Sequence, residues 1–445
     1  MIIIEKDDKM EKLELNISDN LIKLAKAIQS YGGTLYIVGG YVRNAYLNLA
    51  NTDLDICGDL KYDTVLEIAQ SLGYDAHIVN KKLGTVLIKV NDEEYEYTTF
   101  RKENYSKGGM HSPDDVEFVS DIKLDASRRD FTANCLYFNI LSKEVIDVYG
   151  GINDINNHVL RCIKTPEEVF ESDGLRILRL IRIASELGFA IDKQTKKSAK
   201  EYAYQLRDIT AERVLKELKK IVVSDFKYDS TKLSENFLDN FNYINIFQYI
   251  LNSNFANFQI GKRYRTNFFA LPKNFRYIGF CILFLANYFN FKYVNPQQVI
   301  WAVNTYFGPS GLKESSKNLQ TIITTYNLFQ EVVFIGKKSY RRLIMNFYNA
   351  DSEIKKFLES FIPNEYSWLK QDVTILRKRN VPLCLEELNI SNMELIDEAK
   401  INKHITTKIK SKLLIDCLEE EISNTHDTLI AEAKYLNIRI MQNLK

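Results

Sequence analysis

The pattern of apolar residues changes once along this 445-residue chain, and the change limits the folds that the chain can adopt. Up to about residue 150, short β-rich runs such as 35–38 and 85–90 alternate with stretches of helical spacing such as 62–72. After Glu167, helical spacing begins at Leu175 and continues onward with few glycines. The sequence therefore predicts an α+β fold, in which an α/β head with a mixed sheet precedes an all-α remainder.

The composition excludes several classes of protein. Apolar residues make up 45% of the chain, enough to bury sizeable cores, so global disorder is excluded. Lys and Arg total 59 against 58 Asp and Glu, so any nucleic-acid site must be a local patch within a neutral whole. The six cysteines are scattered and form no CxxC pair, which argues against a disulfide framework or zinc ribbon and favours a reducing cytoplasm.

Neither a targeting segment nor a membrane span is expected. Acidic residues follow directly after the apolar run at residues 1–4, which is unlike a signal peptide. The most apolar window, residues 278–289, is too short to cross a bilayer and predicts a buried helix instead. We therefore expect a cytoplasmic protein that contacts no membrane.

Two short motifs in the head point to phosphate and metal chemistry. Gly39 and Gly40 follow a predicted strand and open a predicted helix, where glycine and helix-end amides can approach a triphosphate and Arg43 adds positive charge. Asp53 and Asp55 are i and i+2 in an extended segment, so both carboxylates face one side and can hold Mg²⁺. Each motif alone is commonly a tight turn or a solvated turn, but the two at this spacing are far more specific.

Seven blocks in order carry a family resemblance. They are LYIVGGYVRNAYLNLANTDLDICG (35–58), LGTVLIKV (83–90), EYTTFR (96–101), RRDFTANCLYFN (128–139), DVYGGINDINNHVLR (147–161), ESDGLRILRLIRIASELGF (171–189) and AERVLKELKKI (211–221). Together they resemble the nucleotidyltransferase superfamily, in the branch that contains the bacterial CCA-adding enzymes (tRNA nucleotidyltransferases) and the bacterial poly(A) polymerases.

The resemblance assigns catalytic roles to three carboxylates. Asp53 and Asp55 match the metal-binding pair, and Glu96 is the candidate third carboxylate, with an exposed strand residue as the alternative. Two Mg²⁺ ions held there would activate an RNA 3′-hydroxyl and steady the leaving pyrophosphate. A second set of residues is implied to frame the sugar and phosphates of the nucleotide, with a surface ion-pair cluster as the alternative: Arg128, Arg129, Asp130 and Asn134.

Asp173 and Arg176 are the expected base-recognition pair, placed by the sequence at i and i+3 of one helix. A carboxylate accepts from the exocyclic amine of cytosine or adenine while a guanidinium donates to the adjacent ring nitrogen, and guanine and uracil do not offer that order. The alternative is an intrahelical salt bridge. The resemblance also assigns Arg179 and Arg213 to the nucleotide site, the latter with a solvated pair to Glu217 as its alternative.

The chain departs from the family pattern at two positions beside these residues. The family motif is Glu-Asp-x-x-Arg, and its first position here is Ser172. The family usually has aspartate after Val-Arg, where this chain has Asn44.

Residues 101–113 are predicted to form a mobile loop, because they contain a Gly-Gly pair and are largely polar. In the family, a flexible element here separates enzymes that add the terminal A from those that stop at CC.

Four regions are expected: a head at 1–155 (nucleotidyltransferase, catalytic), a helical neck at 156–225 (base recognition), a helical body at 226–365, and a helical tail at 366–445 that binds tRNA. Segments 388–397 and 405–424 resemble the tail of the bacterial CCA-adding enzymes.

The resemblance implies a template-independent RNA nucleotidyltransferase that adds C, C and A to the tRNA acceptor end from CTP and ATP, with no protein partner predicted. The alternatives are a bacterial poly(A) polymerase, an enzyme that adds only CC or only A, and an inactive RNA-binding relative. A basic run typical of the poly(A) polymerases is replaced by Leu-Gly-Thr-Val at 83–86, and the intact Asp53/Asp55 pair argues against an inactive relative.

Overall fold

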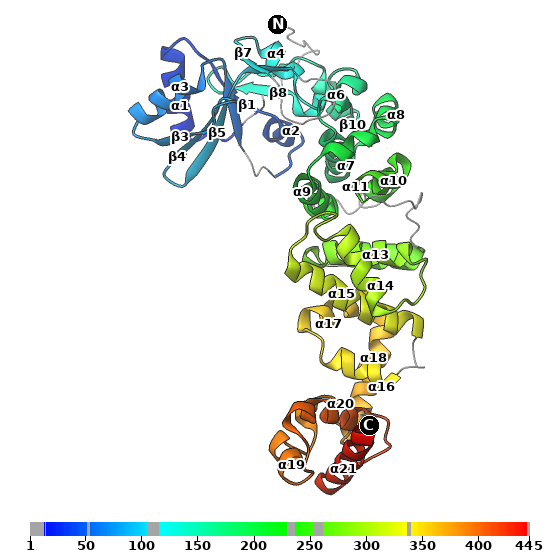
Figure 1. Ribbon diagram of the computed structural model, residues 1–445. Helices are drawn as coiled ribbons and strands as arrows, with labels where there is room; N and C mark the ends of the chain where they lie inside the picture. The colour runs from blue at the N-terminus through cyan, green and yellow to red at the C-terminus, as the bar shows by residue number, and fades with distance from the viewer. Residues whose placement is uncertain are drawn as a thin grey trace. The chain divides into compact units, whose positions relative to one another are not determined.

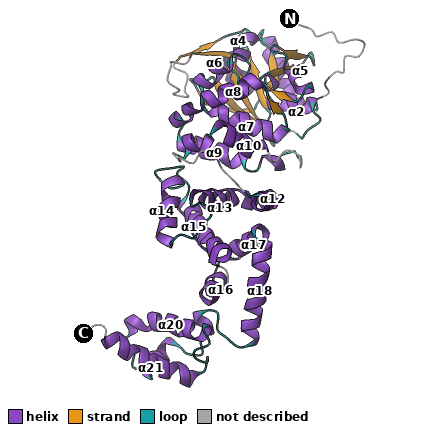
Figure 2. Ribbon diagram, turned by 90° about the vertical axis from the view of Figure 1, so that its right-hand side faces the viewer, coloured by secondary structure: helices purple, strands orange, loops and turns teal. Residues whose placement is uncertain are grey.

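A computed structural model describes residue 13 and residues 15–50, 54–104, 115–228, 236–251, 261–335 and 340–442 (Figure 1). The chain divides into two compact units, residues 1–257 and 258–445. In the described residues, strands gather in the first unit and the second unit is helical (Figure 2).

The first unit is built on a seven-stranded sheet with the order β3-β4-β5-β2-β1-β8-β9. β2 and β5 run parallel, and all the remaining neighbouring strands in this sheet are antiparallel, so the predicted mixed sheet is confirmed. The strands are β1 (Leu35–Val38), β2 (Asp55–Gly58), β3 (Asp75–Asn80), β4 (Thr85–Val90), β5 (Glu93–Thr99), β8 (Leu136–Asn139) and β9 (Val145–Asp147).

β4 and β5 form a hairpin. Val90 pairs with Glu93 across the two-residue turn at Asn91, which adopts a left-handed φ of 55° that asparagine tolerates. Along β5, Tyr95 and Tyr97 are buried while Glu96 is exposed, as the two-residue period of a strand requires. This alternation turns the Glu96 carboxylate away from the core.

Short helices flank the sheet. They are α1 (Asp19–Ser30), α2 (Gly40–Tyr46), α3 (Tyr62–Ser71), α4 (Ile122–Ser127), α5 (Gly151–Asn156) and the 3₁₀ turn η1 (Thr132–Asn134). Ser18 caps α1 by accepting from the backbone N–H of Leu21 at 3.2 Å. The helix that Gly40 opens, α2, ends at Tyr46, and Asn48 then adopts a left-handed φ of 54°.

The expectation of a mobile loop over residues 101–113 is wrong at its start. Residues 101–104 form β6 (Arg101–Asn104), which pairs with β7 (Asp115–Phe118) in a two-stranded antiparallel sheet. Arg101 is buried there and donates to the carbonyl of Leu83 at 3.0 Å. The remainder of the expected loop lies outside the described residues.

The rest of the first unit is mainly helical. It contains α6 (Pro166–Ser172), α7 (Leu175–Leu187), α8 (Lys193–Glu201), η2 (Ala203–Asp208), α9 (Ala211–Ile221), η3 (Ser224–Phe226), α10 (Asn236–Ile244) and α11 (Ile246–Ile250), with two short parallel strands, β10 (Val159–Leu160) and β11 (Ala190–Ile191). α7 is the central helix, because it packs against α6, α9 and α10. It ends at Gly188, whose φ of 69° forms a left-handed C-cap.

The second unit consists of helices around an aromatic core. They are α12 (Lys262–Ala270), η4 (Lys273–Phe275), α13 (Arg276–Tyr288), α14 (Pro296–Tyr306), α15 (Ser316–Gln330), the π-helix η5 (Glu331–Ile335), α16 (Tyr340–Tyr348), α17 (Ser352–Phe361), α18 (Pro363–Lys378), η7 (Leu385–Glu387), α19 (Asn392–Asp397), η8 (Lys403–Ile405), α20 (Thr406–Leu418) and α21 (His426–Gln442). The apolar window at 278–289 lies mostly in α13, whose residues 279–286 are buried, as predicted. None of the described helices combines the length and apolar character needed to span a bilayer.

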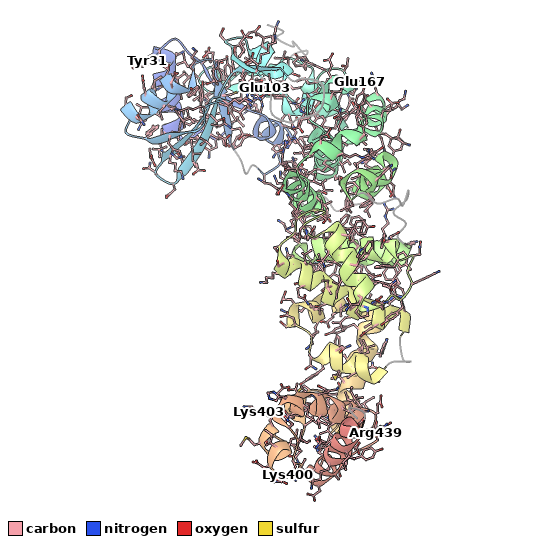
Figure 3. The ribbon with its side chains drawn as sticks, in the orientation of Figure 1. Tyr31, Glu103, Glu167, Lys400, Lys403 and Arg439 are labelled. Carbon is pink, nitrogen blue, oxygen red and sulfur yellow. The ribbon has the colours of Figure 1, made fainter. Side chains whose placement is uncertain are left out.

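The last helices carry exposed cations. Lys400 and Lys403 precede α20, and Arg439 lies near the end of α21 (Figure 3). On α20, Lys412 pairs with Asp416 at 2.5 Å, one turn further along the same helix.

Candidate active site

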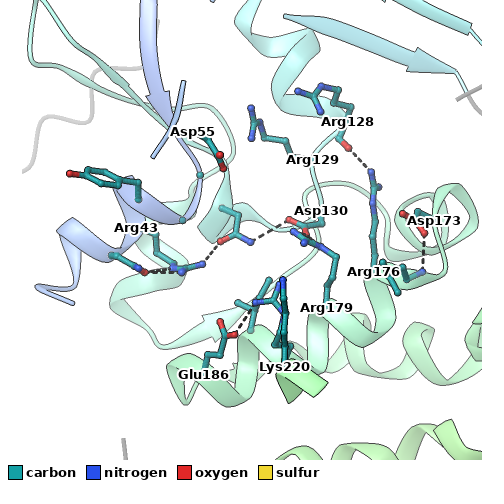
Figure 4. Close-up of a pocket in the computed structure, with 18 of the residues that line it drawn as sticks. Arg43, Asp55, Arg128, Arg129, Asp130, Asp173, Arg176, Arg179, Glu186 and Lys220 are labelled. Carbon is teal, nitrogen blue, oxygen red and sulfur yellow. Dashed lines mark hydrogen bonds and ion pairs between the residues drawn. The ribbon is translucent and has the colours of Figure 1, made fainter. Parts of the chain in front are cut away.

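A pocket of about 580 Å³ opens in the first unit (Figure 4). Its lining brings together α2, the start of β2, the segment from 128 to 134, and helices α7 and α9. Eight arginines line it: Arg43, Arg101, Arg128, Arg129, Arg176, Arg179, Arg182 and Arg213. The pocket is therefore a local cationic patch within a chain of net charge +1. In a nearly neutral chain, a site that binds anions has to be a local patch of this kind.

Gly39 and Gly40 form the turn from β1 into α2 at the edge of the pocket. Gly39 has a φ of 81°, a conformation that side-chain-bearing residues rarely adopt. The turn directs Arg43, one helical turn later, into a buried position where its guanidinium donates to the side-chain oxygens of Asn134 and Asn44. Burial lowers the pKa of Arg43, but an arginine remains protonated at neutral pH.

Two carboxylates meet where β2 and β5 run parallel. Asp55 is the first residue of β2 and lies directly opposite Glu96 in the strand register. Burial and the nearby charge of Asp55 both raise the pKa of Glu96. Carboxylate oxygens placed this way suit a hard divalent cation, which would also relieve their repulsion, so the residues fit a metal. Asp53, the other expected ligand, lies outside the described residues.

The Arg128-Arg129 pair is fixed by one buried carboxylate that sequence reasoning missed. Asp125, within α4, contacts Arg128 at 2.8 Å and Arg129 at 3.1 Å. Arg129 also donates to the hydroxyl of Tyr137 at 2.8 Å, and its guanidinium lies over that ring. Asp125 precedes Arg128 by three residues and Arg129 by four, and this spacing could have indicated the contacts from the sequence.

Asp130 links the head to helix α7. Its carboxylate accepts from Arg179 at 2.6 Å, and Asn134 donates to its other oxygen at 3.4 Å. Burial alone would raise the pKa of Asp130, but Arg179 and Arg176 outweigh burial and lower the pKa to about 2. The carboxylate is therefore ionised at neutral pH and holds Arg179 at the pocket.

Asp173 and Arg176 both line the pocket, but the expectation that they share one helix is wrong. α6 ends at Ser172, Asp173 is extended with φ −154°, and α7 begins only at Leu175. Asp173 accepts from Arg213 Nη2 at 2.9 Å and from the backbone N–H of Leu175 at 3.0 Å. The break in the helix therefore aims the carboxylate at Arg213, a neighbour from α9.

Arg176 is held on the first turn of α7 by uncharged oxygens. Its Nη1 donates to Ser172 Oγ at 2.8 Å, and its Nη2 donates to the backbone carbonyl of Arg128 at 2.6 Å. Ser172, one of the two departures from the family pattern, is thus in direct contact with the candidate base-recognition arginine. Asn44, the other departure, is in direct contact with Arg43.

Several lining residues were not anticipated. Arg182 on α7 contacts Glu217 at 2.5 Å and Glu186 at 2.9 Å, so Glu217 pairs across two helices, not with Arg213 on its own helix. Three more are Lys220, Lys227 and Tyr228. They lie at or beyond the end of α9, and no local pattern signals them, because only the packing of α9 on α7 brings them to the pocket.

Comparisons with known proteins show what parts of this chain are similar to. A family model described as the poly A polymerase head domain matches residues 35–161, and a second, described as a probable RNA and SrmB-binding site of polymerase A, matches residues 188–233. Residues 35–161 are thus similar to the poly A polymerase head domain.

The particular relatives are CCA-adding enzymes. That of Enterococcus faecalis is 36% identical over 198 residues, which are 44% of this chain and 47% of the relative. That of Bacillus subtilis is 35% identical over 191 residues, 43% of this chain and 47% of the relative. The chain thus spans about half the length of the curated relatives it matches.

Solved structures extend the likeness in fold over nearly the whole chain. The CCA-adding enzyme of Bacillus stearothermophilus in complex with CTP aligns with a TM-score of 0.63 and 18% identity, covering 96% of this chain and 100% of that one. The Thermotoga maritima enzyme complexed with tRNA aligns with a TM-score of 0.62 and 18% identity, covering 94% and 95%. The α+β nucleotidyltransferase fold of the chain is therefore that of a CCA-adding enzyme.

Proposed function

We propose that this protein is a template-independent RNA nucleotidyltransferase that adds C, C and A to the 3′ end of tRNA from CTP and ATP, releasing pyrophosphate. One observation carries the proposal: Asp55, which lies opposite Glu96 in the strand register, lines the same arginine-rich pocket as Asp173 and Arg176. Figure 4 draws Asp55 on one side of this pocket and Asp173 with Arg176 on the other.

The comparisons support this activity over its alternatives. The matched curated relatives are named CCA-adding enzymes, and the aligned structures contain CTP in one case and tRNA in another. We propose a cytoplasmic location, because tRNA is a substrate found there. The proposed domain roles are catalysis by the head at 1–155, base recognition by the neck at 156–225, a helical body at 226–365 and tRNA binding by the tail at 366–445.

We propose Mg²⁺ as the metal, held by Asp53 and Asp55, with Glu96 as the third carboxylate of the site. When bound there, it would activate the RNA 3′-hydroxyl and stabilise the leaving pyrophosphate. Gly39, Gly40 and Arg43 would approach the triphosphate, while Arg128, Arg129, Asp130 and Asn134 frame the sugar and phosphates. These groups bind and orient the nucleotide, because most of them are already fixed by contacts within the protein.

Base choice would come from Asp173 and Arg176, with Arg179 and Arg213 holding the surrounding site. The Asp173 carboxylate can accept from the N4 amine of cytosine or the N6 amine of adenine, while Arg176 donates to the adjacent ring nitrogen. Guanine and uracil present a carbonyl and an N–H in those places, which leaves both protein groups unmatched. One protein pair thereby admits C and A without a nucleic-acid template.

The test is extension of a tail-less tRNA, resolved on a gel, with CTP alone, ATP alone and both nucleotides. The proposal expects CC from CTP alone and CCA from both. Long tails from ATP alone would instead identify a poly(A) polymerase, and a product that stops at CC would identify a partial-tail enzyme.

Asp55→Ala and Asp53→Ala should each abolish CMP and AMP addition alike, because the same metal site serves every step. The expected loss is several kcal/mol of transition-state stabilisation, or at least about a thousandfold in rate. Asp208→Ala, at an exposed site in η2, is the control. Near-normal AMP addition by either variant would refute a single shared site.

A further inference from the structure

The pocket extends well beyond the residues that recognise the base. Asp173 lies just before α7, and Glu186, which also lines the pocket, lies 11 residues after Leu175, the first residue of that helix. At 1.5 Å per residue, the lining follows α7 for about 16 Å. A base that is bound at Asp173 therefore leaves the other end of the pocket for the rest of the nucleotide.

That other end, which we call the Glu186 end, is defined by contacts around Glu186. Its carboxylate lies 2.9 Å from Arg182 and 3.4 Å from Lys227. Arg43 belongs to the same end, because the charge of Glu186 acts on it. Figure 4 draws Arg43 and Glu186 toward one side of the pocket and Asp173 on the other. The phosphates of a nucleotide whose base is at Asp173 would lie at this end, near the glycine turn that opens α2.

Most cations at the Glu186 end are offset by carboxylates of the protein. Three of them have a carboxylate oxygen within 4.0 Å: Arg179 with Asp130 (2.6 Å), Arg182 with Glu217 (2.5 Å) and Lys227 with Glu186 (3.4 Å). The positive charge of each is therefore partly neutralised before any ligand binds.

Lys220 differs from these three cations. It lies on the last turn of α9 and lines the pocket. Among the described residues, no carboxylate oxygen lies within 4.0 Å of its Nζ, and Glu217, three residues earlier on the same helix, is engaged by Arg182 at 2.5 Å. Partial burial and then the positive charge of Arg182 lower the pKa of Lys220. An anion bound beside the Lys220 ammonium would therefore stabilise its charged form.

We propose that Lys220 is a further substrate-binding residue, whose ammonium group contacts the β- or γ-phosphate of the incoming nucleotide. The identity of the ligand rests on the proposed function, in which CTP and ATP share one site. Both nucleotides carry the same triphosphate, so Lys220 adds affinity for each without distinguishing their bases. An ammonium suits this role, because it binds phosphate as a point charge with three rotatable donors. α9 thereby serves both ends of the nucleotide, with Arg213 beside Asp173 and Lys220 beside the phosphates.

Two substitutions at Lys220 separate its charge from its shape, and a third provides a control. Lys220→Met removes the charge and keeps an unbranched side chain, whereas Lys220→Arg keeps the charge. Lys216→Met is the matched control, because Lys216 is exposed, lies one turn earlier on α9 and does not line the pocket. The same substitution on the same helix reports any effect on α9 itself.

The first experiment is calorimetric titration of the full-length protein and its variants with CTP and with CMP, without divalent cations. Lys220→Met should weaken CTP binding by about tenfold, equivalent to about 1.4 kcal/mol, and should leave CMP binding unchanged. It should also flatten the dependence of CTP affinity on salt, because screening acts on the charge that it removes. Lys220→Arg should retain most of the affinity for CTP, and Lys216→Met should match the wild type.

The second experiment is steady-state extension of tail-less tRNA, which separates binding from chemistry. In Lys220→Met, the KM values for CTP and ATP should both rise by about tenfold with little change in kcat, because the contact is made equally in the ground state and the transition state. The incorporation of UTP relative to CTP should stay at the wild-type ratio, which a change at the base end of the pocket would move.

Equal losses of CTP and CMP affinity in Lys220→Met would overturn the proposal, because they would place its effect at the nucleoside or in the fold. Unchanged CTP affinity, or equal losses in Lys220→Met and Lys220→Arg, would overturn it as well, since the charge would then not be what binds. The calorimetric test contains no RNA. If it gives the expected pattern but the wild type does not extend tRNA, the assignment of Lys220 stands and the proposed function fails.

Discussion

At the scale of single residues, buried carboxylates hold most of the cations of the site. Asp125 fixes two arginines at once, and Asp130 fixes Arg179 from a position that is 6% exposed. Orienting an arginine in advance reduces the entropy lost when a phosphate binds, so these acids serve the ligand without touching it. They also make the stability of the first unit depend on pH.

Asp130→Asn tests that dependence. The pKa of Asp130 falls from its ordinary 3.8 to about 2, so its ionised form stabilises the fold above about pH 4. This contribution, about 2 kcal/mol, is lost as the pH falls through the folded pKa, and about half is gone by pH 3. The difference in thermal midpoint between wild type and Asp130→Asn should therefore be smaller at pH 3 than at pH 6. Asp208→Asn, at an exposed position, should show no such change, and an unchanged difference for Asp130→Asn would contradict the pairing.

Base choice is the second property of single residues. Asp173→Ala and Arg176→Ala should each relax discrimination by about 1–3 kcal/mol, measured as incorporation of UTP and GTP relative to CTP. Arg213→Ala should act in the same direction but more weakly, because Arg213 only holds the Asp173 carboxylate, at 2.9 Å. An unchanged nucleotide ratio in all three variants would show that these side chains only connect α7 to α9.

At the scale of elements, the break between α6 and α7 decides where the recognition residues point. Gly174 lies in this break, and a Cβ atom there would come within 2.7 Å of the carbonyl oxygen of Gln205 in η2. The close approach lets Asp173 adopt its extended conformation beside the start of α7. Gly174 is therefore required by packing between elements, since its own backbone is in the ordinary helical region.

Gly174→Ala should push η2 and the start of α7 apart. We expect a loss of about 1–3 kcal/mol of stability, as for overpacking in general, together with a higher KM for CTP. Gly261→Ala is the matched control, because nothing lies within 4 Å of its Cβ position. Thermal unfolding and steady-state kinetics on both variants provide the check; equal melting temperatures would show that the contact at Gly174 relaxes freely.

The elements also show what local pattern could predict. The strand that leads into Gly39 and the hairpin at Asn91 follow from periods and turn residues within a few positions, and both are present. The break at Asp173 was missed because it depends on a carbonyl in η2, 31 residues from Gly174 in sequence. The strand at 101–104 was missed because its polar residues form a strand only through pairing with 115–118.

In the candidate site, too, some features could be predicted from the local sequence and others could not. The exposed face of Glu96 follows from the two-residue period of its own strand, so sequence could predict it. Asp125 was accessible in principle from its spacing to Arg128. The contact of Arg182 with Glu217 joins two helices whose packing no local spacing encodes.

At the scale of the whole molecule, every residue that lines the pocket belongs to the first unit. A fragment of residues 1–257 should therefore bind CTP within a few-fold of the full chain. It should bind tRNA far more weakly, since the proposed tRNA-binding tail is missing. Calorimetry with CTP and filter binding with tRNA would measure the two affinities. Loss of CTP binding by a folded fragment would contradict the claim that the first unit contains the whole nucleotide site.

The central position of β1 has a consequence for how the protein is made. Tyr36 of β1 pairs with Asn139 of β8 on one side and with Cys57 of β2 on the other. During translation, β1 therefore emerges long before β8. Until β8 is synthesised, one edge of β1 stays unpaired and its apolar residues, among them Ile37, lack this neighbour. Closing so long a loop is slow, so the nascent chain is exposed to aggregation until β8 leaves the ribosome. Synthesis of this protein should accordingly depend on a chaperone that covers extended apolar segments during that interval.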